Sequence, residues 1–484
     1  MSAGVLALDQ GSHASRACVF DAHGVLRAEH SVAVNTGHAA GERVEQDPLE
    51  LLASLRSVAC AALAQCPGLE VRQAGLVTQR STVLCWNRGT GAPLSAALSW
   101  QDRRNAAWLE TFAAHAARVR VLTGLPLSPH YGVSKLRWCL DHLPQVRDAA
   151  RAHALQAGPL VAWLQAQLCG APARVDPANA SRTLLYDSAK AGWSAELLQL
   201  FGVPGNVLPA CSATRGDFGA LADIRDASNH TIELCALSGD QSAVPFGLGP
   251  VSERTLYINL GTGAFLQLPT RHRPASPAPL LGSVLYADAE RTLYTLEGTV
   301  NGAGSAVSAY CAQHQLDEAQ SWPQLERLPE DAALPVYLNT VGGLGSPWWT
   351  GAVAPQMLGA GTALEGFAAV VESVVFLIAA NAGELRRKGA AMDRVLLSGG
   401  LSRSDLLCRR LATLLGVPVE RAEREASARG VAVLAAPEVA AHWPALVTTR
   451  FEARRHAGLE QRFARFQEIL HARLDAARGQ PPRG

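Results

Sequence analysis

The sequence has few features that would tie the protein to a zinc ion, a nucleic acid or a membrane. Its ten cysteines form no CxxC pair and no Cys/His cluster at zinc spacing, so we expect reduced thiols in the core. The formal net charge is only +1, which gives no reason to expect binding to nucleic acid. The longest apolar run, residues 367–382, contains Glu372. That run is too short for a bilayer, so a buried helix is expected.

The beginning and the length of the chain set its broad class. No charged segment followed by an apolar stretch opens the sequence, so no secretory signal is expected. Together with the unpaired cysteines, this predicts a cytoplasmic protein. A chain of 484 residues exceeds what one hydrophobic core usually supports, so we expect two large domains, residues 1–246 and 247–484.

Two short polar turns, one in each half of the chain, are the most informative local feature. They cover residues 9–13 and 259–263, and each lies between two aliphatic or β-branched runs, which predicts a β-hairpin. A loop rich in Gly, Ser and Thr directs several N–H groups and hydroxyls toward one point, as phosphate binding requires. Either turn alone could be an ordinary hairpin turn. Their repetition favours two similar lobes that face a cleft.

Further helices are predicted from capping residues and apolar periodicity. Asp47 and Pro48 precede apolar residues at helical spacing, which indicates a helix start. The strand 395–397 leads through a third glycine turn into an amphipathic helix over 406–415. The tail 459–474 carries apolar residues on one face and arginines opposite, as a packed surface helix does.

Eight short segments resemble, in order and spacing, the FGGY family of sugar and polyol kinases, and within it the glycerol kinases. They are residues 9–16 (DQGSHASR), 79–82 (QRST), 100–104 (WQDRR), 179–183 (NASRT), 239–241 (GDQ), 261–263 (GTG), 342–349 (GGLGSPWW) and 398–400 (SGG). The resemblance implies an α/β, two-lobed actin-like ATPase fold with duplicated ribonuclease-H-like units. It also implies ATP-dependent phosphorylation of a hydroxyl of a small polyol or sugar.

The resemblance implies roles for two carboxylates. Asp240 would be the catalytic base, which accepts the proton of the acceptor hydroxyl. From the residues alone, Asp240 fits helix N-capping equally well. Asp9 would hold Mg²⁺ directly or through water, with Asp240 beside the metal.

The nucleotide side implied by the resemblance departs from the family at three positions. His13, Ser308 and Ser404 replace a small hydroxyl residue, a glutamine and an asparagine, so weaker ATP binding is expected. The ATP-binding residues implied are Ser12, His13, Arg16, Gly261, Thr262, Gly263, Gly304, Ser308, Gly399, Gly400 and Ser404.

The acceptor side departs at one position that bears on specificity. Ser81 stands where glycerol kinases have glutamate, so a carboxylate that would grip two substrate hydroxyls is missing. The acceptor-binding residues implied are Arg80, Ser81, Trp100, Tyr131, Asp240, Gln241 and Phe265.

The acceptor is therefore left open at this point. A pentulose kinase of the xylulose or ribulose type and a catalytically weak regulatory protein are alternatives, as is an actin-like chaperone or filament protein. The expected partner is a small polyol or sugar, with no nucleic acid and no membrane, and analogy with similar kinases suggests a homodimer.

Overall fold

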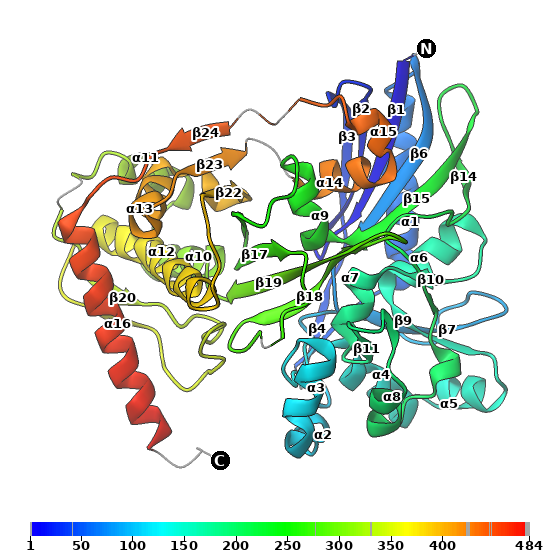
Figure 1. The fold of residues 1–484 in the computed structure, drawn as a ribbon, viewed down its shortest axis with the longest axis horizontal. Coiled ribbons are helices and arrows are strands. Elements are labelled where there is room, and N and C mark those ends of the chain that lie inside the picture. Colours follow the sequence, from blue (N-terminus) through cyan, green and yellow to red (C-terminus); the bar gives the residue numbers. More distant parts are fainter. Residues whose placement is uncertain are drawn as a thin grey trace.

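The chain folds into two lobes, each built around a mixed β-sheet (Figure 1). The structure, a computed structural model, describes residues 2–40, 42–275, 277–329, 332–422, 426–444, 446 and 448–479. All ten cysteines are free thiols, as expected for a chain without a disulfide framework.

The sheet of the first lobe has six strands. Its central hairpin joins β1 and β2 in antiparallel register, while β6 and β15 continue from β1 in parallel. The order is β3 (Leu26–Ala33), β2 (Ala14–Asp21), β1 (Ser2–Gln10), β6 (Leu69–Thr78), β15 (Thr231–Gly239) and β14 (Ala220–Arg225).

The sheet of the second lobe repeats this arrangement. The hairpin β16–β17 is antiparallel, and β22 and β23 continue from β16 in parallel. The order is β18 (Leu281–Ala287), β19 (Thr292–Val300), β17 (Ala264–Thr270), β16 (Thr255–Leu260), β22 (Arg394–Ser398), β23 (Val419–Ala422) and β24 (Thr448–Phe451). Both predicted hairpins are confirmed, and they occupy matching places in the two sheets.

The rest of the first lobe consists of a separate five-stranded sheet, two short strand pairs and nine α-helices in the described residues. A five-stranded sheet has the order β4 (Gly37–Ala39), β5 (Arg43–Gln46), β8 (Ala97–Leu98), β7 (Val83–Asn87) and β9 (Leu155–Pro159). Short strand pairs join β10 (Arg174–Val175) to β13 (Ala210–Cys211) and β11 (Tyr186–Asp187) to β12 (Gly192–Trp193). The helices are α1 (Pro48–Ala64), α2 (Ala106–Glu110), α3 (Ala116–Thr123), α4 (Gly132–His142), α5 (Pro144–Arg151), α6 (Leu160–Cys169), α7 (Pro177–Ala180), α8 (Ala195–Phe201) and α9 (Asp240–Gly247).

The second lobe is covered by helices that include the predicted buried one. They are α10 (Gly304–Gln313), α11 (Glu318–Leu325), α12 (Ala363–Arg387), α13 (Asp405–Leu415) and α16 (Ala457–Arg478), and the strands β20 (Val336–Leu338) and β21 (Gln356–Leu358) form a separate pair. By length and composition α12 could cross a membrane, but 83% of its apolar window is buried inside the protein. Its Glu372 pairs with Arg462 of α16 at 2.7 Å and with Arg410 of α13 at 3.3 Å.

The predicted helix starts and the tail helix are confirmed. The Asp47 side chain accepts a hydrogen bond from the Leu49 N–H at the start of α1, so its oxygen satisfies a free helix donor. α16 buries Leu459, Phe466 and Leu470 and runs along the outer flank of the second lobe (Figure 1).

The chain returns to the first lobe near its end, through α14 (Ala426–Ala435) and α15 (Pro437–Ala440) (Figure 1). α14 packs against α9, β1 and β6. The approach of α14 to α9 requires glycine, because a Cβ on Gly430 would lie 1.9 Å from the Ala243 carbonyl oxygen. This packing brings residue 427 beside residue 9, across almost the whole sequence.

Candidate active site

The candidate site lies at the carboxyl ends of parallel strands in both sheets. In the first lobe Asp9, Arg80 and Asp240 stand at or just after the ends of β1, β6 and β15, which are neighbours in the sheet. In the second lobe the turns after β16 and β22 carry Gly261 and Gly399. Carboxyl ends of adjacent parallel strands meet at one edge of a sheet, so these groups converge.

Asp240 is the first residue of α9, and Gly239 occupies the N-cap position. The Asp240 Oδ1 accepts a hydrogen bond from the N–H of the next residue, Gln241, at 2.6 Å, and no side chain caps the helix. The helix-capping alternative for Asp240 is therefore wrong. Its carboxylate is held at the strand end instead.

A cavity of about 310 Å³ lies between the lobes at this edge. It brings together nine of the predicted site residues, namely Asp9, Ser12, His13, Arg16, Asp240, Gln241, Gly261, Gly399 and Gly400. Its lining also includes Gly11, Ala14, Val244, Asn259, Ser398, Ala426 and Ser427. Both hairpin turns thus contribute to one cavity, which fits the idea of two phosphate loops that face each other.

The backbone at the second turn is packed too closely for a side chain at Gly263 and Gly304, whereas a Cβ on Gly261 would only reach 3.9 Å from the Gly263 carbonyl oxygen. A Cβ on Gly304 would lie 2.8 Å from the Gly261 carbonyl oxygen, which also accepts the Gly304 N–H at 3.0 Å. At Gly400, in contrast, a Cβ would meet nothing within 4 Å. The missing side chain at Gly400 therefore leaves open space on the cavity side, which is what a nucleotide would need.

Five residues expected on the nucleotide side do not line this cavity. Thr262, Gly263 and Gly304 support the turn, since the Thr262 carbonyl accepts hydrogen bonds from the N–H groups of residues 303 and 305. The Ser308 hydroxyl donates to Glu318 at 2.9 Å. The Ser404 hydroxyl donates to Glu326 at 2.8 Å and accepts the Leu407 N–H at the start of α13.

Two carboxylates face the cavity and influence each other. Burial raises the pKa of Asp240 to about 6. The positive charge of Arg80 lowers this pKa, and the negative charge of Asp9 raises it. Burial also raises the pKa of Asp9, while a hydrogen bond from Ser427 and the charge of Arg16 lower it. Each carboxylate makes the other harder to ionise, so a cation between them would be favoured.

These groups fit Mg²⁺ that is bound together with nucleotide phosphates. The residues that the structure describes contain no cluster of three or more His, Cys, Asp or Glu side chains suited to a metal. Mg²⁺ in nucleotide sites uses one or two carboxylates and completes its shell with phosphate oxygens and water. The pair of Asp9 and Asp240 supplies that number.

The acceptor side is built around a buried carboxylate that joins the lobes. Glu297 on β19 of the second lobe pairs with Arg80, 3.2 Å away, and with Arg182, both of the first lobe. Their side chains are only 4–9% exposed. Burial alone would raise the pKa of Glu297, but the charges of Arg182 and Arg80 outweigh it and lower the pKa to about 2.

The remaining acceptor-side residues surround this cluster. Burial raises the pKa of Tyr131, on which the charges of Arg182, Glu297 and Arg80 also act, so the Tyr131 ring lies beside them. Phe265 is paired with residue 299 across β17 and β19, two positions from the pair of Gln267 and Glu297. Side chains two positions apart in a strand share a face, so Phe265 projects toward the first lobe with Glu297.

Two side chains connect the acceptor side to the phosphate loops. The Trp100 indole N–H donates to the Ser12 hydroxyl at 2.8 Å, and that hydroxyl donates to the Gln79 Oε1 at 3.2 Å. Gln241 accepts a hydrogen bond from Asn259 of the second lobe at 3.1 Å. The Ser12 hydroxyl, predicted to face phosphate, is thus held by residues of the acceptor side.

Ser81 has a strained backbone and a free hydroxyl. Its φ is +66°, a left-handed conformation that side-chain-bearing residues seldom adopt. Within the described chain its hydroxyl has no hydrogen-bond partner, while its carbonyl oxygen accepts a bond from Lys135 at 2.8 Å. The position that lacks the family's glutamate is therefore held through its backbone.

Sequence reasoning gave no role to several residues of the site. Arg182 lies in a motif that carried the resemblance, and Asn259 belongs to the second polar turn. Lys135, Glu297 and Ser427 stand in ordinary helical or strand surroundings, and only their tertiary contacts reveal them.

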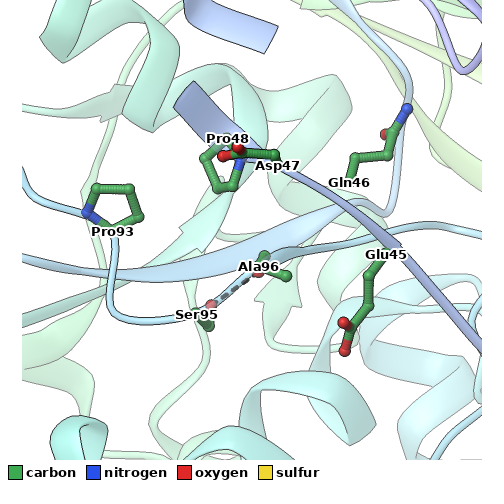
Figure 2. Close-up of a pocket in the computed structure, with 7 residues that line it drawn as sticks. All are labelled: Glu45, Gln46, Asp47, Pro48, Pro93, Ser95 and Ala96. Carbon is green, nitrogen blue, oxygen red and sulfur yellow. Dashed lines mark hydrogen bonds between the residues drawn. The ribbon is translucent and has the colours of Figure 1, made fainter. Parts of the chain in front are cut away.

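A second hollow, of about 380 Å³, lies outside the cleft beside the start of α1 (Figure 2). Its polar side chains already have partners. Glu45 pairs with Arg104 at 2.6 Å, Asp47 caps α1, and the Ser95 hydroxyl bonds to the Ala96 carbonyl at 2.8 Å. Gln46 supports the first phosphate loop by donating to the Ser12 carbonyl at 3.0 Å. Each polar side chain that lines the hollow is thus already engaged within the protein.

The duplicated sheets and the cavity between them define a two-lobed α/β protein of the actin-like ATPase fold, with one glycine-rich turn from each lobe at the cavity. The chain belongs to the FGGY family of carbohydrate kinases. Residues 4–247 match the N-terminal domain of that family, and residues 256–438 match its C-terminal domain.

Similar proteins agree with this assignment. The chain is 36% identical over 453 residues to the glycerol kinase of Alkalilimnicola ehrlichii, with 90% of each chain covered. Its fold is similar to that of Plasmodium falciparum glycerol kinase, with a TM-score of 0.89, 20% identity and 99% of each chain covered. A xylulose kinase from Lactobacillus acidophilus has a TM-score of 0.83 and 17% identity, with 97% of this chain and 98% of that chain covered.

Proposed function

We propose that this protein transfers the γ-phosphoryl group of ATP, in the presence of Mg²⁺, to a hydroxyl of a small polyol or sugar, with Asp240 as the base. The observation that supports this most is the place of Asp240. It lines the cavity between the phosphate loops, and its pKa responds to Arg80 of the acceptor side and to Asp9.

The chemistry follows from these groups. Asp9 and Asp240 would hold Mg²⁺, which would offset the negative charge of the phosphates. Burial raises the pKa of Asp240 to about 6 in the absence of a metal, and its ionised carboxylate accepts the proton of the acceptor hydroxyl. The hydroxyl oxygen bonds to the transferred phosphorus as the bond from that phosphorus to ADP breaks.

The turns of both lobes hold the phosphates in line with the hydroxyl. Ser12, His13 and Arg16 act from the first lobe, and Gly261, Thr262 and Gly263 act from the second. Gly304, Ser308, Gly399, Gly400 and Ser404 border the nucleotide, with the Ser308 and Ser404 hydroxyls acting mainly through the helices that they support. Backbone N–H groups placed in advance stabilise developing charge without reorganisation.

The acceptor binds against Arg80, Tyr131, Trp100, Gln241 and Phe265. Contacts between the lobes, such as the pairing of Glu297 with Arg80, exclude water, which would otherwise compete as the phosphoryl acceptor. The relatives named as glycerol kinases favour glycerol or another polyol.

A pentulose is the second candidate acceptor. Ser81 offers a short hydroxyl where glycerol kinases have a carboxylate, and a larger acceptor would use the space that is left. Ser81→Glu is expected to raise kcat/KM for glycerol relative to ketopentoses if the pocket otherwise suits glycerol. A Ser81→Thr variant, which restores no carboxylate, is the matched control.

ADP release with Mg-ATP and a panel of glycerol, tetritols, pentitols, ketopentoses, ketohexoses and ketoheptoses tests the proposal. Turnover with one acceptor, well above ATP hydrolysis without acceptor, supports the kinase and names its substrate. ATP binding without turnover on any acceptor contradicts it and favours the regulatory alternative.

A cytoplasmic location and a homodimer are proposed as well, on the unpaired thiols and on analogy with similar kinases. Light scattering of the purified protein tests the homodimer, and fractionation of the source cells tests the location.

A further inference from the structure

Lys135 on α4 is fully buried. Burial lowers the pKa of its amino group to about 7, while hydrogen bonds to carbonyl oxygens favour its ammonium form. Its Nζ donates three hydrogen bonds, to the carbonyl oxygens of Ser81 at 2.8 Å, Ser99 at 2.9 Å and His130 at 2.9 Å. An ammonium has three donors, so every one is used. In the described chain no carboxylate lies within ion-pair distance of this group.

The three carbonyls belong to three separate segments of the first lobe. Ser81 follows β6, Ser99 follows β8, and His130 precedes α4. Each adjoins a residue proposed to bind the acceptor, because Ser81 follows Arg80, Ser99 precedes Trp100 and His130 precedes Tyr131. One side chain therefore joins the backbones that carry the acceptor wall.

Weaker links between the same segments do not replace it. The Thr82 hydroxyl accepts the Trp100 N–H at 3.1 Å, and the His130 ring bonds to the Trp100 carbonyl at 3.1 Å. Both links concern Trp100, whereas among the side chains that the structure describes only that of Lys135 bonds to all three segments. It also bonds to Ser81, whose φ of +66° needs support from its surroundings.

An apolar residue at this position would leave the Ser81 and His130 carbonyls without this donor, and an unpaired carbonyl is costly where it is buried, as at Ser81. The Ser99 carbonyl would keep the Asp102 N–H at 3.0 Å but would lose its link to the other two segments. Burial of an ammonium group also costs free energy. The three hydrogen bonds that Lys135 makes are what this cost maintains. Its other charged neighbours are Asp102 and Arg104, which pair with each other at 2.6 Å.

We infer that Lys135 is the positioning residue of the acceptor site, and that it fixes Arg80, Trp100 and Tyr131 relative to one another through their backbones. Its three donors are used by backbone carbonyls, so it acts through these segments and not as a binding group. This inference rests on the proposed function, because it takes those three residues as the acceptor wall. Displacement of binding groups by about 1 Å can cost about 100-fold in rate, so the effect should be large.

Lys135→Met, which keeps the length and removes all three donors, tests the inference on the full-length protein. The KM for the best acceptor is expected to rise about 10- to 100-fold, while the KM for ATP and the Kd for ADP stay within about twofold of the original protein. Lys190→Met, at an exposed lysine in the turn before β12, is the matched control and should change neither KM.

A KM for acceptor that stays unchanged, or that rises by the same factor as the KM for ATP, would overturn the inference. Should Lys135→Met not fold, Lys135→Gln keeps an amide with two donors. It should show a smaller rise that is again confined to the acceptor, and a rise shared with ATP would overturn the inference here too. If the original protein phosphorylates no acceptor, the proposed function fails instead, so the two failures are distinct.

Discussion

The two walls of the cleft are built by different means. The nucleotide wall consists largely of backbone, with turns so tight that a Cβ on Gly399 would lie 2.5 Å from the Asn259 Oδ1. The acceptor wall consists of buried side chains, with Glu297 between Arg80 and Arg182 and Lys135 beneath three carbonyls. A wall made of backbone tolerates few changes, whereas a wall made of side chains can be altered to accept another substrate.

Removal of the charge of Glu297 is expected to have the largest effect. Glu297→Gln leaves Arg80 and Arg182 buried without a carboxylate, which should lower the free energy of unfolding by about 3–5 kcal/mol at pH 7. The folded pKa of Glu297 is lowered to about 2 from 4.5. Its stabilisation is therefore complete above pH 4.5 and is lost as the pH falls toward 2.

Urea unfolding at several pH values measures this effect. The difference between the original protein and the variant should shrink below pH 4.5. Glu438→Gln, at an exposed carboxylate 3.6 Å from Arg215, should change the free energy by less than about 0.5 kcal/mol. If both variants changed the free energy of unfolding equally, the acceptor wall would not depend on its buried charged side chains, contrary to the difference between the two walls.

Asp240→Asn should stabilise the protein at neutral pH while it removes the base. The folded pKa of Asp240 is raised from 3.8 to about 6, so the folded state binds its proton more tightly. Its favourable contribution is complete below pH 3.8 and is lost as the pH rises through 6. Above pH 6 the variant should gain on the order of 2–3 kcal/mol, whereas Asp148→Asn, at an exposed residue of α5, should not. Unfolding without nucleotide and Mg²⁺ is the measurement.

Substitutions at the two adjacent glycines of the third turn should separate an effect on stability from an effect on nucleotide binding. Gly399→Ala introduces a side chain at φ +92° and should lower the free energy of unfolding by about 1–3 kcal/mol. Gly400→Ala meets nothing within 4 Å, so stability should stay within about 0.5 kcal/mol while the KM for ATP rises. Unchanged ATP kinetics in Gly400→Ala would show that the nucleotide does not use this space.

The smallest expected effect is at the contact between Ser427 and Asp9. Ser427→Ala removes a hydrogen bond of 2.7 Å to the Asp9 Oδ2, which should cost about 1 kcal/mol and raise the Mg²⁺ concentration needed for half-maximal rate. Ser427→Thr keeps the hydroxyl and should retain the original Mg²⁺ dependence. A titration of the rate with Mg²⁺ distinguishes the two.

The sequence allowed more to be predicted on the nucleotide wall than on the acceptor wall. The hairpins after residues 9 and 259 and the turn after Ser398 are local patterns of glycine and polar residues, so their form follows from a few neighbouring positions. Whether Asp240 caps α9 or begins it depends on a shift of one residue, which local patterns do not resolve.

The contacts of the acceptor wall could not be predicted from local sequence patterns. Glu297 meets Arg80 from 217 positions away. The same holds for one contact beside the metal carboxylates, where Ser427 meets Asp9 from 418 positions away. Such pairs depend on how the two sheets and α14 pack together, and no short segment encodes them. Ser81 could be recognised as a departure, but the lysine that supports its carbonyl could not.

The assignment of Asp240 as the base is best tested by the pH dependence of kcat. It is measured with the best acceptor and Mg-ATP, for the original protein and for Asp240→Asn. We expect kcat of the original protein to fall only at a pH below the metal-free pKa of about 6, because Mg²⁺ beside Asp240 lowers that pKa. We expect the variant to be slower by about 10²- to 10⁴-fold although it binds ATP. An Asp240→Asn protein that keeps a rate close to the original would contradict the assignment of Asp240 as the base.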